Sequence, residues 1–110
     1  MTISELIKNA RLNEKEVLET NGVKIVLRHE SGGDINFNDM FSITLCDAET
    51  DEWILDTGDI HISDLYVCLY EFCSFGKNID SKAIRSSFSY QFGLDINEKY
   101  FNEKEGAIEH

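Results

Sequence analysis

Residues 34–75 read DINFNDMFSITLCDAETDEWILDTGDIHISDLYVCLYEFCSF, and this stretch dominates both the fold and the charge of the chain. It contains no Lys or Arg, and its ten acidic residues are Asp34, Asp39, Asp47, Glu49, Asp51, Glu52, Asp56, Asp59, Asp64 and Glu71. The residues on either side are nearly balanced, so the formal net charge of −11 lies almost wholly in this segment. Its apolar residues recur at strand and helix spacings, which indicates a folded acidic region and not an acidic tail.

The first half of this segment is patterned as β-structure. Its expected strand residues are Phe41, Ile43, Leu45, Trp53, Ile54 and Leu55. The polar residues 47–51 form a turn between the two strands, and Thr57-Gly58-Asp59 is expected to break the sheet. Upstream, alternation over 23–28 predicts one further strand. Short polar links between consecutive strands favour an antiparallel meander.

The second half of the segment has the spacing of a helix. Its apolar stripe, which should lie on the sheet, is Leu65, Cys68, Leu69, Phe72 and Phe75. Asp59 or Ser63 can cap the start of this helix, and Gly76 fits its end. Tyr66 and Tyr70 are four residues apart and fall on another side of the helix.

The chain opens with an amphipathic helix. Thr2 and Glu5 have the spacing of a capping box, and the apolar residues that share one face behind them are Ile3, Leu6, Ile7 and Ala10. The same cap spacing recurs at 13–16 and predicts a second short helical stretch through Leu18, which a turn at 21–22 ends.

Two helices are predicted near the C-terminus. The first begins at Asp80 or Ser81, and its inward residues are Ile84, Phe88 and Phe92. The second opens at a capping box formed by Asp95 and Glu98. Residues 105–110 are expected to fray.

These elements predict an α+β fold: a three-stranded antiparallel sheet with an N-terminal helix and two or three C-terminal helices packed on it. The length of 110 residues fits one compact domain over 1–110. We interpret the odd number of cysteines as reduced core residues, since no C-x-x-C pattern joins Cys46, Cys68 and Cys73. No apolar run reaches the roughly 18 residues of a transmembrane helix or forms a signal-peptide core, so we expect the host-cell cytoplasm.

One short motif has a catalytic resemblance. Asp56-Thr57-Gly58 follows a strand and resembles the active-site triplet of retroviral-type aspartic proteases, whose chemistry needs two such loops in a dimer. In that family mostly strands follow the triplet, whereas helical spacing follows it here. A strand that ends in a glycine turn is therefore the simpler interpretation.

A second motif has the spacing of a calcium loop. Asp47, Glu49 and Asp51 occupy the first, third and fifth positions, but Glu52 stands where glycine is required and Gly58 where the last Glu is required. Weak cation binding by clustered carboxylates stays open. We predict no catalytic residue, no cofactor and no metal site.

The tyrosine pair and the acidic cluster each have two interpretations. Tyr66 and Tyr70 lie beside Asp64 and Glu71 and either form an interface for a basic partner or pack under the last helices. The acids either keep the protein soluble or form a binding surface. Same-side residues of a strand recur about every 6.8 Å, so a row of carboxylates can imitate the phosphates of nucleic acid.

The layout is similar to a known family. The opening helix over residues 2–8, TISELIK, followed by a sheet with an acidic hairpin and by closing helices, resembles small phage-encoded anti-CRISPR proteins that block Cas9. Those inhibitors are similar in size and acidity, and some occupy the pocket in which Arg and Lys read the PAM. The resemblance implies that the first candidates for contacting such a pocket are Asp47, Glu49, Asp51 and Glu52.

We therefore predict a non-enzymatic DNA mimic of the anti-CRISPR type that binds a basic nucleic-acid-handling protein, without direct contact to nucleic acid or membrane. The predicted partner-binding residues are Asp47, Glu49, Asp51, Glu52, Asp56, Asp59, Asp64, Tyr66, Tyr70 and Glu71. An immunity protein that neutralises a basic nuclease toxin is the alternative, because charge complementarity would serve it equally. A dimeric hydrolase that uses Asp56 is a third hypothesis.

Overall fold

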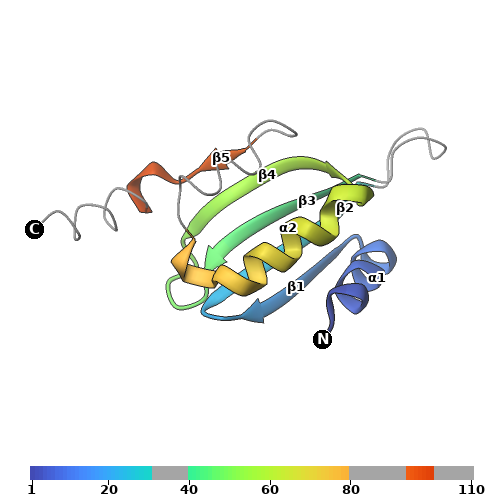
Figure 1. The fold of residues 1–110 in the computed structure, drawn as a ribbon, viewed down its shortest axis with the longest axis horizontal. Coiled ribbons are helices and arrows are strands. Elements are labelled where there is room, and N and C mark those ends of the chain that lie inside the picture. The colour runs from blue at the N-terminus through green and yellow to red at the C-terminus, as the bar shows by residue number, and fades with distance from the viewer. Residues whose placement is uncertain (31–39, 80–93, 101–110) are drawn as a thin grey trace, which may run out of the picture.

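The structure is a computed structural model and describes residues 1–30, 40–79 and 94–100. Its elements in chain order are α1 (Ile3–Asn13), β1 (Lys15–Thr20), β2 (Val23–Glu30), β3 (Met40–Asp47), β4 (Trp53–His61), α2 (Ile62–Phe75), the 3-10 turn η1 (Gly76–Asn78) and β5 (Asp95–Ile96). The strands form one antiparallel sheet in the order β1-β2-β3-β4-β5 (Figure 1). The predicted α+β class and antiparallel sheet are confirmed, but the described residues give the sheet five strands, not three.

Both helices cover the same face of the sheet. α1 contacts β1 and β2, and α2 crosses β3 and β4 diagonally (Figure 1). The sheet residues buried beneath them include the predicted alternating set, Val23, Ile25, Leu27, Phe41, Ile43 and Leu45. Because alternate residues of a strand point to opposite faces, the residues between them lie on the second face of the sheet, away from α1 and α2.

α1 is the helix that its sequence predicts. The Thr2 hydroxyl accepts a hydrogen bond from the Glu5 backbone N–H at 3.1 Å, and the Glu5 carboxylate reaches back to the Thr2 N–H. The helix buries Leu6, Ile7 and Ala10. It ends at Glu14, whose left-handed φ of 68° turns the chain directly into β1.

The predicted helical stretch through Leu18 is wrong, because this segment is β1. The strand pairs with β2 along its whole length, with Leu18 opposite Ile25. Asn21 and Gly22 have φ values of 50° and 82°, the two positive angles of a type I′ hairpin turn. An Asn-Gly pair between alternating residues is therefore a hairpin signal here and does not end a helix.

The expected sheet break at Thr57-Gly58-Asp59 is also wrong, because β4 continues to His61. Two register shifts between β3 and β4 mark β-bulges, one beside Thr57 and Gly58 and one beside Ile54. The buried Thr57 hydroxyl accepts a hydrogen bond from the Ile43 backbone N–H at 3.0 Å. The Thr57 hydroxyl thus takes the place of the backbone carbonyl that would normally accept this bond. Pairing between β3 and β4 continues on both sides of the bulge.

α2 buries four of the five stripe residues predicted for it, Leu65, Cys68, Leu69 and Phe72, whereas Phe75 is exposed. Its N-cap is His61, whose Nδ1 accepts from the Ser63 backbone N–H at 3.2 Å, so the predicted caps Asp59 and Ser63 are wrong. Its predicted end at Gly76 is confirmed.

Only some of the C-terminal predictions fall on residues that the structure describes. The helix predicted from Asp80 or Ser81, with Ile84, Phe88 and Phe92 inward, lies outside the described residues, as do residues 105–110. Asp95 does not open a helix: it lies in β5, opposite Asp56 of β4. Residues 98–100 are helical, so the predicted helix begins after a short strand.

Gly76 offers a direct test of how the end of α2 packs against the β1–β2 turn. Gly76 has a φ of 53°, and a Cβ at this position would collide with the backbone oxygen of Asn21. We expect Gly76→Ala to lower the free energy of unfolding by about 2–3 kcal/mol, because neither the backbone angle nor the neighbouring carbonyl can adapt cheaply. Denaturant unfolding followed by circular dichroism measures the loss.

Gly22→Ala is the matched control. A Cβ at Gly22 would meet only the flexible Lys77 side chain at 3.2 Å, so this variant should lose less stability than Gly76→Ala although its φ is also positive. Equal losses in the two variants would contradict the close approach at Gly76.

Candidate functional site

The turn between β3 and β4, residues 47–52, holds four of the predicted partner-binding acids, and we call it the hairpin tip. Its backbone is closed by two hydrogen bonds: Asp51 N–H donates to the Asp47 carbonyl at 2.9 Å, and Asp47 N–H donates to the Glu52 carbonyl at 2.8 Å. Asp51 has a positive φ of 61°, as a tight turn requires. The Thr50 hydroxyl accepts from the Glu52 N–H at 3.2 Å. The tip is therefore a rigid, internally bonded loop.

Asp47 is the buried anchor of the hairpin tip. It is only 9% exposed, and its carboxylate accepts a hydrogen bond from the Glu49 backbone N–H at 2.8 Å. Burial alone would raise the pKa of Asp47, but the bonds from the Glu49 and Thr50 backbone and from the Lys77 ammonium lower it below its ordinary value. Asp47 is thus a structural carboxylate that stays charged inside the fold.

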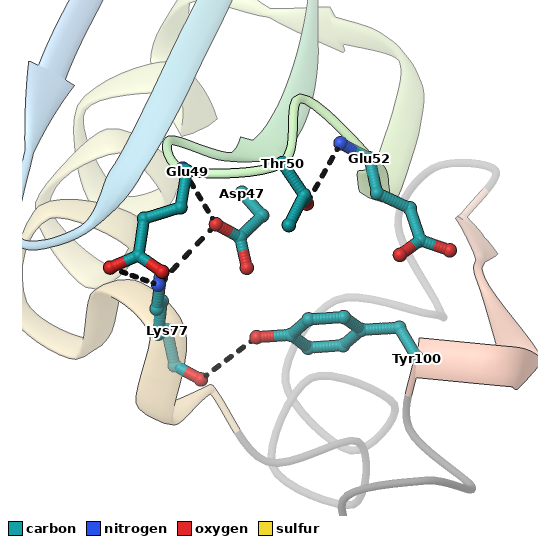
Figure 2. Close-up of polar contacts among 6 residues, drawn as sticks. All are labelled: Asp47, Glu49, Thr50, Glu52, Lys77 and Tyr100. Carbon is teal, nitrogen blue, oxygen red and sulfur yellow. Dashed lines mark hydrogen bonds and ion pairs between the residues drawn. The ribbon is translucent and has the colours of Figure 1, made fainter.

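Lys77 of η1 is the counter-charge that the sequence analysis missed. Its Nζ lies 3.3 Å from Asp47 and 3.4 Å from Glu49, between the two carboxylates (Figure 2). Its backbone carbonyl accepts from the Tyr100 hydroxyl at 3.4 Å. The Ala48 N–H donates to the Gly22 carbonyl at 3.0 Å, so the tip rests on both η1 and the β1–β2 turn.

The other three acids of the hairpin tip are more exposed than Asp47. The side chains of Glu49 and Asp51 are 81% and 72% exposed, and Asp51 also forms an ion pair with Lys24 of β2 at 2.6 Å. This contact raises the pKa of Lys24. Glu52 points away from Lys77 and accepts from the Asn97 side chain at 3.4 Å (Figure 2). The tip therefore presents two exposed carboxylates, those of Glu49 and Asp51, and the half-buried carboxylate of Glu52 around the buried Asp47.

Asp56 and Asp59 lie on β4, and Asp56 faces the second side of the sheet. Asp56 accepts from the Thr44 hydroxyl and from the Gly58 backbone N–H, both at 3.0 Å. Arg28 donates to the same Thr44 hydroxyl at 3.0 Å. Asp59 is exposed opposite Ser42. The triplet that resembles a protease site is therefore held inside a bulged strand, and its carboxylate is engaged by the strand itself.

The remaining predicted residues lie on α2. Tyr66 and Tyr70 are exposed, whereas Asp64 and Glu71 are partly exposed. The Tyr66 hydroxyl lies 3.4 Å from the Ser4 hydroxyl of α1. The ten predicted residues thus lie in three separate places: the hairpin tip, β4 and α2. They do not form one continuous row.

Other kinds of site find little support in residues 1–30, 40–79 and 94–100. In these ranges no three His, Cys, Asp or Glu side chains gather as they would around a metal ion. None of the helices there is both long and apolar enough to cross a membrane. The three cysteines are free and at least partly buried, and burial raises the pKa of the Cys68 thiol to about 12. Such a thiol is protonated at neutral pH and is a poor nucleophile.

Asp47 provides the stability test of the hairpin tip. Asp47→Ala removes the acceptor of a partly buried hydrogen bond and the partner of Lys77, and should cost about 2 kcal/mol in unfolding free energy. The folded pKa lies below the ordinary 3.8, so the carboxylate stabilises the fold above that pH and loses this effect as the pH falls through the folded pKa. Wild-type stability should therefore drop more steeply than that of the variant below about pH 4.

Glu49→Gln is the matched control, because this side chain also contacts Lys77 but is largely exposed. It should change unfolding free energy by less than about 0.5 kcal/mol and leave unchanged the steep loss of stability below about pH 4, which we call the acid limb. Parallel acid limbs in wild type and Asp47→Ala would show that Asp47 is not the responsible group.

Comparison with known proteins does not indicate a function for this chain. Neither a family model, nor a curated protein, nor a solved structure matches the chain significantly. The resemblance to anti-CRISPR proteins therefore rests on layout and charge. What the chain binds has to be argued from the hairpin tip and the neighbouring surfaces.

Proposed function

We propose that the protein is a small acidic inhibitor that occupies the basic nucleic-acid-binding site of a nuclease or effector complex, of the anti-CRISPR type. The observation that carries this proposal is the hairpin tip. Glu49, Asp51 and Glu52 extend from one turn, and the buried Asp47 fixes the backbone of that turn. The contact is therefore with Arg and Lys side chains that otherwise hold phosphates.

Rigidity is what makes the hairpin tip suitable for this role. A charged group held in place before binding loses little conformational entropy on association. Hydrogen bonds within the turn and to the β1–β2 turn, together with the contact of Asp47 with Lys77, hold the backbone that carries these acids. A flexible acidic loop of equal charge would bind more weakly because it would first have to be ordered.

The two lysines beside the hairpin tip do not block such a partner. Lys24 and Lys77 pair with the exposed carboxylates of Asp51 and Glu49 at the protein surface. Exposed ion pairs contribute about 0–1 kcal/mol, so they exchange readily. Arg from a partner can displace them, since its planar guanidinium binds a carboxylate through two hydrogen bonds. The same geometry would serve an immunity protein, and the identity of the partner distinguishes the two roles.

A three-site neutralisation tests this proposal. The tip variant carries Glu49→Gln, Asp51→Asn and Glu52→Gln and keeps Asp47, so it should fold normally. Immobilised wild type should retain a basic nucleic-acid enzyme from nuclease-rich host lysate at low salt and release it at high salt. The tip variant should retain at least about tenfold less, and short duplex DNA should compete with the wild type for the enzyme identified by mass spectrometry.

The control removes the same charge at the opposite end of the sheet, with Glu14→Gln, Glu16→Gln and Glu30→Gln. It should retain the enzyme nearly as well as the wild type, because exposed charges more than about 10 Å away are screened. If both variants lost enzyme retention equally, the total negative charge of the protein and not the hairpin tip would be responsible for binding. A partner that duplex DNA does not displace would contradict occupation of a nucleic-acid site.

A further inference from the structure

α2 carries an exposed apolar surface that the proposed function does not use. Tyr66, Val67 and Tyr70 are 49%, 59% and 65% exposed. At about 100° per residue these three side chains span an arc of about 100° on the side of the helix away from the sheet. We call this surface the α2 stripe.

The α2 stripe differs from ordinary exposed apolar residues. Leu12 of α1 and Val17 of β1 are also exposed, but each is a single residue of its element, as is usual on protein surfaces. α2 has apolar residues on the stripe as well as on the face that packs on the sheet. A helix that is apolar on both faces is typically covered on both.

Charge distinguishes between the occupants that could cover the α2 stripe. Residues 62–75 contain no Lys or Arg, and Asp64 and Glu71 are the acids of this helix. They are seven residues apart, so they lie two turns apart along one edge of the stripe. A second copy of the chain would bring the same acids against them, and like charges across an interface are unfavourable. A positively charged partner meets no such repulsion.

We propose that the α2 stripe binds a basic amphipathic helix of a protein partner. The apolar face of that helix packs on Tyr66, Val67 and Tyr70, and its Lys or Arg residues lie opposite Asp64 and Glu71. Tyrosine suits such a contact because it offers a large apolar area with few rotatable bonds and a hydroxyl that can still form a hydrogen bond, as that of Tyr66 can with Ser4. The stripe is a separate surface from the hairpin tip and goes beyond the function proposed for the tip.

A designed peptide tests the α2 stripe without knowledge of the partner. The probe is a labelled helical peptide of Leu and Lys, with Leu along one face, and the control peptide has the same composition in scrambled order. Fluorescence anisotropy against the full chain should give saturable one-to-one binding for the amphipathic peptide and clearly weaker binding for the scrambled one. Equal binding of the two peptides would overturn the proposal, because charge alone would explain it.

Substitutions then locate the contact. Tyr66→Ser with Tyr70→Ser should weaken peptide binding at least about tenfold, whereas Leu12→Ser, an equally exposed apolar residue elsewhere, should change it less than about twofold. Asp64→Asn with Glu71→Gln should reduce the salt dependence of binding, and Glu16→Gln with Asp59→Asn should not. Thermal melts verify that each variant is folded.

Two further results would overturn the proposal. The first is unchanged peptide affinity in the folded double tyrosine variant, which would place the contact elsewhere. The second is sedimentation of the wild type as a dimer that the two tyrosine substitutions abolish, which would make a second copy the occupant. The tip variant with Glu49→Gln, Asp51→Asn and Glu52→Gln keeps the stripe unchanged. Adding Tyr66→Ser and Tyr70→Ser to it should therefore weaken peptide binding by the same factor as in the wild type.

Discussion

A carboxylate buried at the end of β3 determines where α2 can lie. Asp47 is held by backbone N–H groups of its own turn and by Lys77, which follows α2 directly. At the same corner the Asn21 side chain donates to the carbonyls of Cys73 and Ser74, at 3.4 and 3.1 Å, in the last turn of α2. The C-terminal end of α2 is thus fastened to two hairpin turns, and the helix must run diagonally from there to His61 (Figure 1).

This arrangement changes the meaning of the acidic segment. In sequence the central acids are unbroken by any base, but the fold sends the eight that lie within the described residues to the hairpin tip, to β4 and to α2. It also brings Lys24 and Lys77, from outside the segment, into contact with the tip. A run of acids along the chain therefore does not produce a row of acids in space, because strand pairing and helix packing choose the neighbours of each carboxylate. The cost of like-charge repulsion is correspondingly lower than the sequence suggests.

The parts of the fold that were predictable are those fixed by local chemistry. The Thr2–Glu5 capping box, the alternation of β2 and β3 and the glycine at the end of α2 each depend on a few adjacent residues. β1 was missed because a cap-like spacing and an Asn-Gly turn have two readings until a partner strand is known. The bulges of β4 were missed because they depend on a bond from Ile43 to the Thr57 side chain, across two strands. For the same reason the sequence named the acids of the tip but not Lys77, whose role is set by the packing of α2.

The hairpin tip and the α2 stripe differ in the range over which they act. In the proposed complex, charges at the tip would act over about 8 Å at physiological salt and would influence how fast a basic partner arrives and how it is oriented. The tyrosines of α2 would act only on contact, where burial of apolar area slows dissociation. Lys77 follows α2 and contacts Asp47 of the tip. The two surfaces are therefore connected through the same corner of the fold. A partner that touched both would gain rapid encounter from one and a long-lived complex from the other, without any change in the shape of the protein.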